Sequence, residues 1–262
     1  MRQQRSKFAL LWCLAAMLAA VGMSGCVSQR VVKGEEQPAQ RFNAKEAAQT
    51  RLALGLEYLQ NNDFQQAKFN LEKALEYAPD NADVQLGLAY YYQRADNPDT
   101  AAEHYQKALR LAPQNGDVLN NYGVLECSRG RYQAADELFR KALQVKGYFR
   151  MASTYENAAD CAVAAEQPEQ ALQYYEQAVN FDPQNSTMLE RYAGLLLDLQ
   201  RPTEARQVLR QRARLPELSA TYLWLEVRTA KALNQPEQMR YFAGLLRERF
   251  PNSRYQQQLE SL

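Results

Sequence analysis

Histidine is almost absent from this chain, and neither sign of charge dominates. Among 262 residues there is one histidine, His104, and 31 Lys and Arg stand against 30 Asp and Glu, giving a formal net charge of +1. A single histidine leaves little for histidine-based metal binding or general-base catalysis. Balanced charge implies no basic surface, so we expect no nucleic-acid binding.

Glycine and proline are also scarce, at 11 and 10 residues. The glycines are isolated from one another, which excludes glycine-rich loops that hold phosphates or dinucleotides. Carboxylates are scattered at helical spacing, and no pair stands out as an acid–base dyad. We therefore expect no enzymatic activity, no cofactor, no metal site and no small-molecule substrate. The apolar fraction of 46% is that of a folded protein, and abundant Ala, Leu, Gln and Glu favour helices.

The first 25 residues resemble a bacterial lipoprotein signal peptide. Three basic residues among the first seven precede an apolar run over 8–21, which is too short to anchor in a bilayer. Met23-Ser24-Gly25-Cys26 then places small residues before a cysteine, as in signals where that cysteine is acylated and becomes the new N-terminus. The alternative is an ordinary cleaved signal peptide in which Cys26 occurs by chance.

Acylation of Cys26 would tether the protein without a transmembrane helix, because each buried lipid CH₂ contributes about 0.8 kcal/mol of membrane affinity. Val27, rather than aspartate, follows the cysteine. By resemblance to the sorting signal of Gram-negative bacteria, this favours the periplasmic face of the outer membrane. Residues 26–47 are polar and aperiodic, and we interpret them as a flexible spacer with a reach of roughly 25 Å.

From residue 48 onward the sequence repeats with a period of 34 residues. A small residue recurs at Ala67, Ala101, Ala135, Ala171 and Ala205, and Met239 ends the series, with spacings of 34, 34, 36, 34 and 34. Three further series share the register, including prolines near the unit ends. The pattern resembles the tetratricopeptide repeat (TPR). We place six repeats, the third longer by two residues around 145–150, at 48–81, 82–115, 116–151, 152–185, 186–219 and 220–253.

Each repeat should form two antiparallel helices, A and B. Four prolines fall at one repeat position, where the first turn of helix B tolerates a missing N–H: Pro98, Pro168, Pro202 and Pro236. No unit can bury its apolar stripe alone, so stacking must bury it. We predict an all-α, right-handed superhelical TPR solenoid over 48–253, with a capping helix in 254–262. Repeats five and six depart from the consensus, most clearly at Arg212.

Two cysteines remain after the predicted cleavage besides Cys26. Cys127 and Cys161 fall in the A helices of repeats three and four, at nearly the same repeat position. Neighbouring A helices pack side by side, so in an oxidising compartment the two thiols are candidates for a disulfide. The alternative is two independent buried cysteines.

The A helices should line a concave face suited to a partner. In repeat one, Leu52, Leu56 and Leu59 lie at spacings of four and three and share one helical face, apart from the face that packs within the repeat. In repeat two, Leu86 and Tyr90 extend this strip. Such a strip must be covered, by a partner segment or by the spacer, or else by simple packing on repeat two.

Three further residues are candidates on the same face. Asn121 and Asn157 occupy equivalent positions in repeats three and four, where side-chain amides can hold a peptide backbone. Trp224 is the one tryptophan left after the predicted cleavage and falls on the groove side of the last A helix. It is a candidate anchor for a partner, and a core role is the alternative.

A lipoprotein signal, a spacer and six repeats together resemble the type IV pilus biogenesis lipoprotein family called PilF or PilW. Four segments carry the resemblance over roughly 23–255, although Ala159-Asp160 departs from the family pattern. The resemblance implies a pilotin, which binds the secretin subunit of the outer-membrane channel and promotes its localisation and multimerisation. The segments are Leu54-Gly55-Leu56-Glu57-Tyr58-Leu59, Leu119-Asn120-Asn121-Tyr122-Gly123, Tyr155-Glu156-Asn157-Ala158-Ala159 and Arg249-Phe250-Pro251-Asn252-Ser253.

Two other functions fit the sequence. One is a TPR lipoprotein scaffold for another envelope machine, such as β-barrel assembly or the regulation of peptidoglycan synthases. The other is a cell-wall enzyme or enzyme activator, and the lack of a catalytic constellation argues against the enzyme.

Overall fold

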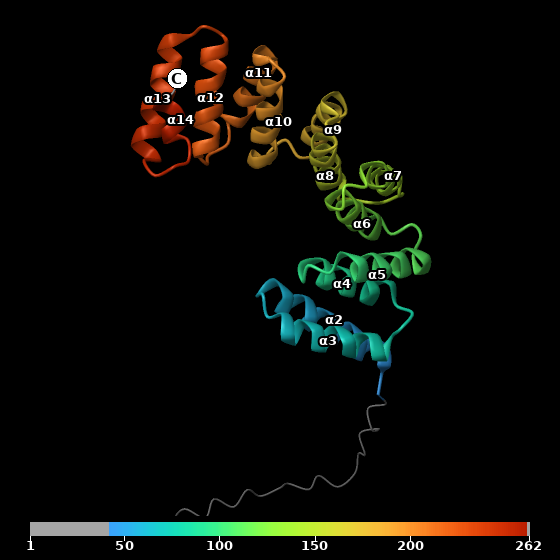
Figure 1. Cartoon of the computed structure of the whole chain (residues 1–262). Helices are drawn as coiled ribbons and strands as arrows, with labels where there is room; N and C mark the ends of the chain where they lie inside the picture. Colours follow the sequence, from blue (N-terminus) through green and yellow to red (C-terminus); the bar gives the residue numbers. More distant parts are fainter. Residues whose placement is uncertain (1–41, 261–262) are drawn as a thin grey trace, which may run out of the picture. The chain divides into compact units, whose positions relative to one another are not determined.

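A computed structural model describes residues 42–260, and over this range the chain forms helices and no strand (Figure 1). The signal peptide, Cys26 and most of the predicted spacer lie outside the described residues. The helices are α2 (Ala44–Gln60), α3 (Phe64–Tyr77), α4 (Ala82–Arg94), α5 (Pro98–Leu111), α6 (Gly116–Ser128), α7 (Tyr132–Leu143), α8 (Met151–Ala164), α9 (Pro168–Phe181), α10 (Ser186–Asp198), α11 (Pro202–Arg212), α12 (Ala220–Ala232), α13 (Pro236–Arg249) and α14 (Gln256–Glu260).

Consecutive helices pair, and each pair packs on the next along the chain (Figure 1). The strongest packing is within pairs, from α2 with α3 to α12 with α13, while α2 also contacts α4, α6 contacts α8 and α10 contacts α12. Helix α14 packs on α13. The predicted all-α solenoid of six helix pairs with a terminal capping helix is confirmed.

The helix boundaries follow from local chemistry. All four prolines that share a repeat position begin a B helix, as predicted. Side chains of Asn81, Asn115 and Asn185 accept hydrogen bonds from the first-turn amides of A helices α4, α6 and α10. These caps satisfy donors that the helix itself leaves unpaired.

The predicted spacer is wrong at its end, because α2 begins at Ala44 rather than near residue 48. The Asn43 side chain accepts hydrogen bonds from the amides of Lys45 and Glu46, at 3.1 and 3.3 Å, and Glu46 lies in the first turn, where a negative charge is favourable. The last four residues assigned to the spacer are therefore helical.

The turn inside every helix pair contains one residue in the left-handed region. Only one of these six residues is a glycine, and three are Asn or Asp, whose short polar side chains tolerate this region; Glu166 and Gln200 carry a steric cost of about 1–2 kcal/mol that glycine avoids. The repeat period fixes the position of the turn, and it recurs at Asn62, Asp96, Gly130, Glu166, Gln200 and Asn234.

Gln200→Gly is expected to raise the melting temperature by about 1–3 °C, because it relieves a left-handed residue at a small entropic cost. Gln200 has φ of 59° and is exposed. The matched reverse change is Gly130→Ala, where a Cβ would contact nothing within 4 Å and only the backbone is strained. Gly130→Ala should lower the melting temperature. If both variants melt at the temperature of the wild type, the steric explanation is wrong.

Glycines in the A helices allow close packing inside the repeats. A Cβ at Gly55 would lie 2.7 Å from Leu71 Cγ, and one at Gly123 would lie 2.7 Å from Phe139 Cε1. Any larger residue would push the two helices of a pair apart. At the far end, Tyr255 and Leu259 are buried in the cluster formed by α10 to α13, so the C-terminal segment closes the last apolar face.

Arg212, at which repeat five departs from the consensus, forms a buried ion pair. Arg212 occupies the position of a core alanine in earlier repeats and is 1% exposed. Its Nε donates to Glu190 Oε1 at 2.7 Å, Ser219 Oγ donates to the same oxygen at 2.7 Å, and the guanidinium lies 5.2 Å from the centre of the Tyr222 ring. The pair links α10, α11 and α12.

Arg212→Ala should destabilise the last helix pairs by about 3–5 kcal/mol, because it leaves the Glu190 carboxylate buried without its cation. Hydrogen exchange of amides in α10 to α12 should accelerate accordingly, while amides in α2 to α5 stay protected. Arg247→Ala, an exposed arginine of α13, is the control. Unchanged exchange in α10 to α12 would show that the pair carries no net stability.

Candidate partner-binding surface

The strip predicted in repeats one and two lies where α2 meets α4. Leu52 and Leu56 are half-buried, and the side chains of both lie close to Gly87 of α4. A Cβ at Gly87 would lie 2.6 Å from Leu52 Cδ1 and 3.8 Å from Leu56 Cδ2. The glycine thus makes room for the two leucines, and part of the strip is used for packing on repeat two.

Leu59 was predicted wrongly as a groove residue. It is 0% exposed and packs with Leu71 of α3 and Leu88 of α4. Near the end of α2 the next helix pair covers the face that the other two leucines leave partly open. Leu59 therefore belongs to the core.

The outer part of the strip is formed by α4. Leu86 is half-buried beside the cluster that contains Ala89 and Leu125, while Tyr90 is 38% exposed. Leu52 keeps some exposure but packs against the core cluster of α2 to α4 and lies nearest to Gly87, so Leu56, Leu86 and Tyr90 are the predicted strip residues that we assign to a partner. We call these three residues the N-terminal strip.

The two predicted asparagines are connected through a third that the sequence did not single out. Asn157 of α8 donates from Nδ2 to Asn120 Oδ1 of α6 at 3.1 Å, and Asn120 Nδ2 donates to Asn121 Oδ1 at 3.1 Å. Asn120 is buried, while Asn121 and Asn157 are half-buried. The amides thus join neighbouring A helices, and this use competes with binding of a peptide backbone.

Trp224 is half-buried in α12 and takes part in an aromatic stack. Its ring lies 5.6 Å from that of Tyr255, with 16° between the planes. The pair borders a hollow of about 650 Å³ between α10, α12 and the C-terminal segment. One face of the indole is therefore packed, as the core alternative expects, and the role of Trp224 as an anchor for a partner stays a prediction.

Cys127 of α6 and Cys161 of α8 are joined as a disulfide, with 5.8 Å between their Cα atoms. The bond cross-links the A helices of repeats three and four. It lies beside a cluster that contains Ala135, Phe139 and Ala158.

Protein taken from an oxidising compartment and denatured without reductant should show no free thiol at Cys127 or Cys161. The bond closes a loop of about 35 residues, worth roughly 3–4 kcal/mol in the chain-entropy account. The double variant Cys127→Ser/Cys161→Ser should therefore have a lower melting temperature than the wild type. The wild type in the presence of reductant should melt at the same temperature as the double variant. Two titratable thiols per chain in the unreduced protein would contradict the pairing.

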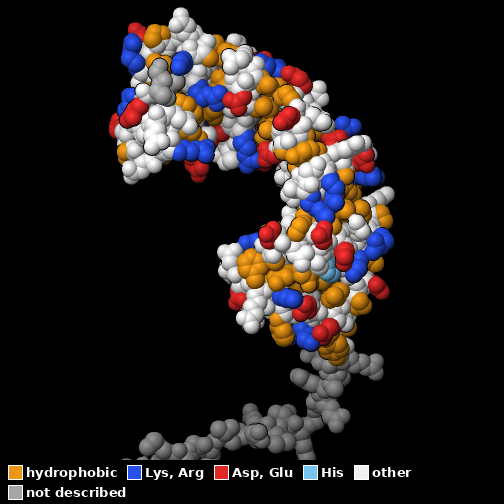
Figure 2. All heavy atoms as spheres, viewed as in Figure 1, with side chains coloured by type: hydrophobic (Ala, Val, Ile, Leu, Met, Phe, Trp, Pro, Cys, Tyr) orange, Lys and Arg blue, Asp and Glu red, His pale blue; other side chains and the backbone are white. Residues whose placement is uncertain are grey.

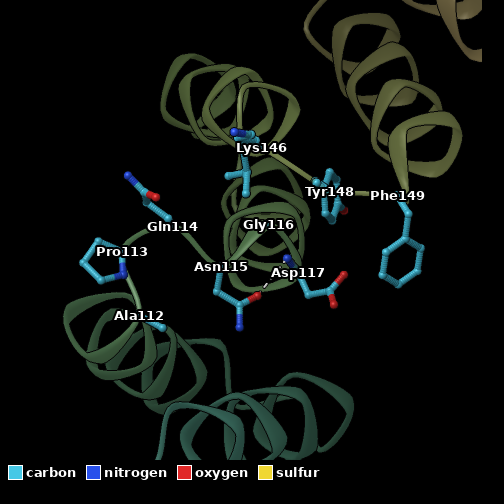
Figure 3. A pocket seen from close by; sticks show the side chains of 11 residues that line it. Ala112, Pro113, Gln114, Asn115, Gly116, Asp117, Lys146, Tyr148 and Phe149 are labelled. Atoms are coloured by element: carbon cyan, nitrogen blue, oxygen red, sulfur yellow. Dashed lines mark hydrogen bonds between the residues drawn. The ribbon is translucent and has the colours of Figure 1, made fainter.

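The longer third repeat contains a hollow of about 750 Å³, which is lined by residues 112–117 around the start of α6 and by residues 145–149 (Figure 3). Tyr148 covers Gly116, where a Cβ would lie 2.4 Å from Tyr148 Cδ2, and its hydroxyl pairs with Thr154 Oγ1 at 2.8 Å. The next residue, Phe149, points outward and is 81% exposed (Figure 3). The sequence predicted an extra turn here but gave no sign of an exposed aromatic ring.

The surface shows no field of a single charge sign on the face in view, since basic and acidic side chains alternate over it (Figure 2). Within residues 42–260, no group of three or more His, Cys, Asp or Glu is arranged to hold a metal ion. No helix in that range combines the length and apolar character needed to cross a bilayer. His104 stacks on Tyr92 with ring centres 5.4 Å apart, and burial lowers its pKa.

Comparison with known proteins agrees with the repeat assignment. The tetratricopeptide-repeat family matches residues 52–115, 114–184 and 162–215. The type IV pilus assembly protein PilF of Pseudomonas aeruginosa is 31% identical over 245 residues, which cover 93% of this chain and 96% of that protein.

Two solved structures share the arrangement of helix pairs. That of Pseudomonas aeruginosa PilF aligns with a TM-score of 0.72 at 30% identity and covers 83% of this chain and 98% of the solved one. PilW, a widely conserved type IV pilus biogenesis factor, aligns with a TM-score of 0.72 at 26% identity, covering 82% and 98%. The chain therefore belongs to the PilF/PilW family of tetratricopeptide-repeat proteins of type IV pilus biogenesis.

Proposed function

We propose that the protein is a pilotin, a lipid-anchored scaffold that binds the type IV pilus secretin subunit and promotes its multimerisation in the outer membrane. Membership of the PilF/PilW family supports a role in pilus biogenesis. The observation that carries the binding claim is the N-terminal strip, where one aromatic and two aliphatic side chains remain partly open on adjacent A helices.

The strip suits an amphipathic helix of the partner. Leu86 and Tyr90 are four residues apart in α4, so they lie on one side of that helix, and α2, which carries Leu56, packs beside α4. A partner helix anchors in such a groove by side chains spaced three and four residues apart. Tyrosine is one of the residues enriched among those that carry most of the binding energy at protein interfaces.

Membrane attachment through Cys26 would bring this strip to the site of secretin assembly. The anchor precedes α2 by fewer than 20 residues, so the first helix pair is the part of the fold nearest to it in sequence. We therefore assign the first two repeats, rather than the last two, to secretin binding.

Deletion of the gene tests the function as a whole. We expect loss of secretin multimers, with secretin monomers still synthesised, and loss of surface pili and twitching motility. Expression of the intact chain in trans should restore all three. Normal multimers in the deletion strain would contradict the pilotin role, and would leave the other kind of envelope scaffold as the better explanation.

A further inference from the structure

A second hollow, at the other end of the repeats, combines a cavity, an aromatic stack and surplus positive charge. It measures about 650 Å³ and lies between α10, α12 and the segment 254–258 that follows the last helix pair. Trp224 and Tyr255 form the stacked pair described above. Residues 254–258 follow the final pair, and the stack of Tyr255 on Trp224 places this segment against α12, the last A helix.

The floor of this C-terminal hollow contains a glycine that helix packing does not require. Gly194 lies inside α10, where glycine costs about 0.5–1 kcal/mol relative to alanine. A Cβ there would meet only Leu225 Cδ2, at 3.8 Å, which is an ordinary contact. Gly55 and Gly123, by contrast, are forced by neighbours at 2.7 Å. The missing side chain at Gly194 keeps the hollow open.

Three arginines border the C-terminal hollow, and two of them are already paired. Arg191 pairs with Glu156 and Asp160 of α8, and Arg228 donates to Asp198 at 2.7 Å. Arg254 instead donates to the Tyr255 hydroxyl at 2.7 Å and lies 4.8 Å from the centre of that ring, and no carboxylate of residues 42–260 pairs with it.

The acids of the lining do not offset this charge. The Glu190 carboxylate is used by the buried Arg212, and Asp198 is used by Arg228. The lining therefore presents a guanidinium without a carboxylate next to an aromatic ring and the apolar residues Gly194 and Leu225. A carboxylate is the group that a guanidinium binds most specifically, through charge-assisted hydrogen bonds.

We propose that the C-terminal hollow is a second peptide-binding site, for a partner segment that carries an aspartate or glutamate beside an apolar side chain. The apolar side chain would enter over Gly194 and contact Leu225 and Trp224, and the carboxylate would bind Arg254. The site is distinct from the N-terminal strip and does not depend on secretin being the partner there.

The test uses the full chain with Trp12→Phe, so that Trp224 is the sole tryptophan whether or not residues 1–25 are removed, and its emission reports on the hollow. A displayed library of random twelve-residue peptides with blocked C-termini is selected on this protein and, in parallel, on its Gly194→Leu variant. Leucine at 194 should project into the hollow and obstruct the surface beside Leu225 without disturbing helix packing, since the Cβ has room and leucine favours helix. Peptides enriched only on the protein with Gly194 should contain an acid next to an apolar residue.

Enriched peptides are then titrated against Trp224 emission. Replacing the acidic residue of the peptide by its amide should weaken binding at least 10-fold, and so should Arg254→Gln. When both changes are combined, the affinity should fall little further than with either change alone. Arg247→Gln, an exposed arginine of α13 outside the hollow, should bind like the parent.

Three results would overturn the proposal. One is the absence of peptides that distinguish the parent from Gly194→Leu. Another is equal binding of acidic and amide peptides to the parent protein. The third is undiminished binding of the acidic peptides to the Arg254→Gln variant. Circular dichroism of each variant confirms that the fold is retained.

Discussion

Cys26→Ala is expected to release the protein from the outer membrane into the soluble periplasmic fraction and to remove the mass of the attached lipid. The cysteine follows Met23-Ser24-Gly25, and it supplies the thiol that the lipid would need. Within residues 42–260 no helix offers another way to span the bilayer. Membrane affinity would then rest on acyl chains, at about 0.8 kcal/mol per buried CH₂.

Fractionation and intact-mass measurement decide this prediction. Ser28→Ala, two residues away, is the matched control and should remain lipidated in the outer membrane. Val27→Asp should keep the lipid but shift the protein toward the inner membrane, because the residue after the cysteine is expected to direct sorting. A Cys26→Ala protein that still sediments with outer membrane, at unchanged mass, would refute lipidation.

Tyr90→Glu is expected to abolish secretin multimerisation while the protein stays folded and membrane-bound. Tyr90 is the most exposed member of the N-terminal strip, at 38%. Burying a large apolar side chain contributes about 1.5–3 kcal/mol, which corresponds to roughly 10- to 150-fold in affinity. Placing a charge in the same contact adds the cost of desolvating it.

The matched control for this prediction is Tyr241→Glu, the same change at a tyrosine of α13 that is 62% exposed. It should leave secretin multimers intact. Leu56→Glu and Leu86→Glu should also block assembly, but both residues are half-buried, so each must be checked for thermal stability first. Asn157→Ala should matter less, because its amide bonds Asn120. Normal multimers with a folded Tyr90→Glu protein would move the binding face elsewhere.

The fold could be predicted from the sequence because one repeat period determines both where the helices begin and where they approach one another closely. The same period places the prolines at the start of B helices and the small residues where helices approach closely. Even the departure at Arg212 marked a real structural change, although its partner Glu190 could not be foreseen, since the two lie 22 residues apart and meet only in the folded core.

The candidate surface was harder to predict. The spacing of residues along a helix shows which side chains share a face of that helix, but it does not show which neighbouring helices cover that face. Leu52, Leu56 and Leu59 share a face of α2, yet the next helix pair covers Leu59 completely and leaves Leu56 half-open. That difference depends on the angle between successive pairs and on the room at Gly87. No residue pattern within one helix contains this information.

Other surface features arise from contacts between distant segments. The link from Asn157 to Asn120 spans 37 residues, and the stack of Trp224 on Tyr255 joins the last A helix to the C-terminal segment. Exposure of Phe149 follows from Tyr148 being fixed over Gly116, which turns the next side chain outward. Each requires the three-dimensional arrangement of helix pairs.

The most direct test of the central claim is photo-crosslinking in living cells. A benzophenone amino acid is placed at position 90, in an otherwise intact chain, and, for comparison, at position 241. We predict that irradiation joins the secretin subunit to the protein from position 90 and not from position 241. Crosslinking of secretin from position 241 alone, or of other envelope proteins but no secretin from position 90, would contradict the assignment of the N-terminal strip to secretin assembly.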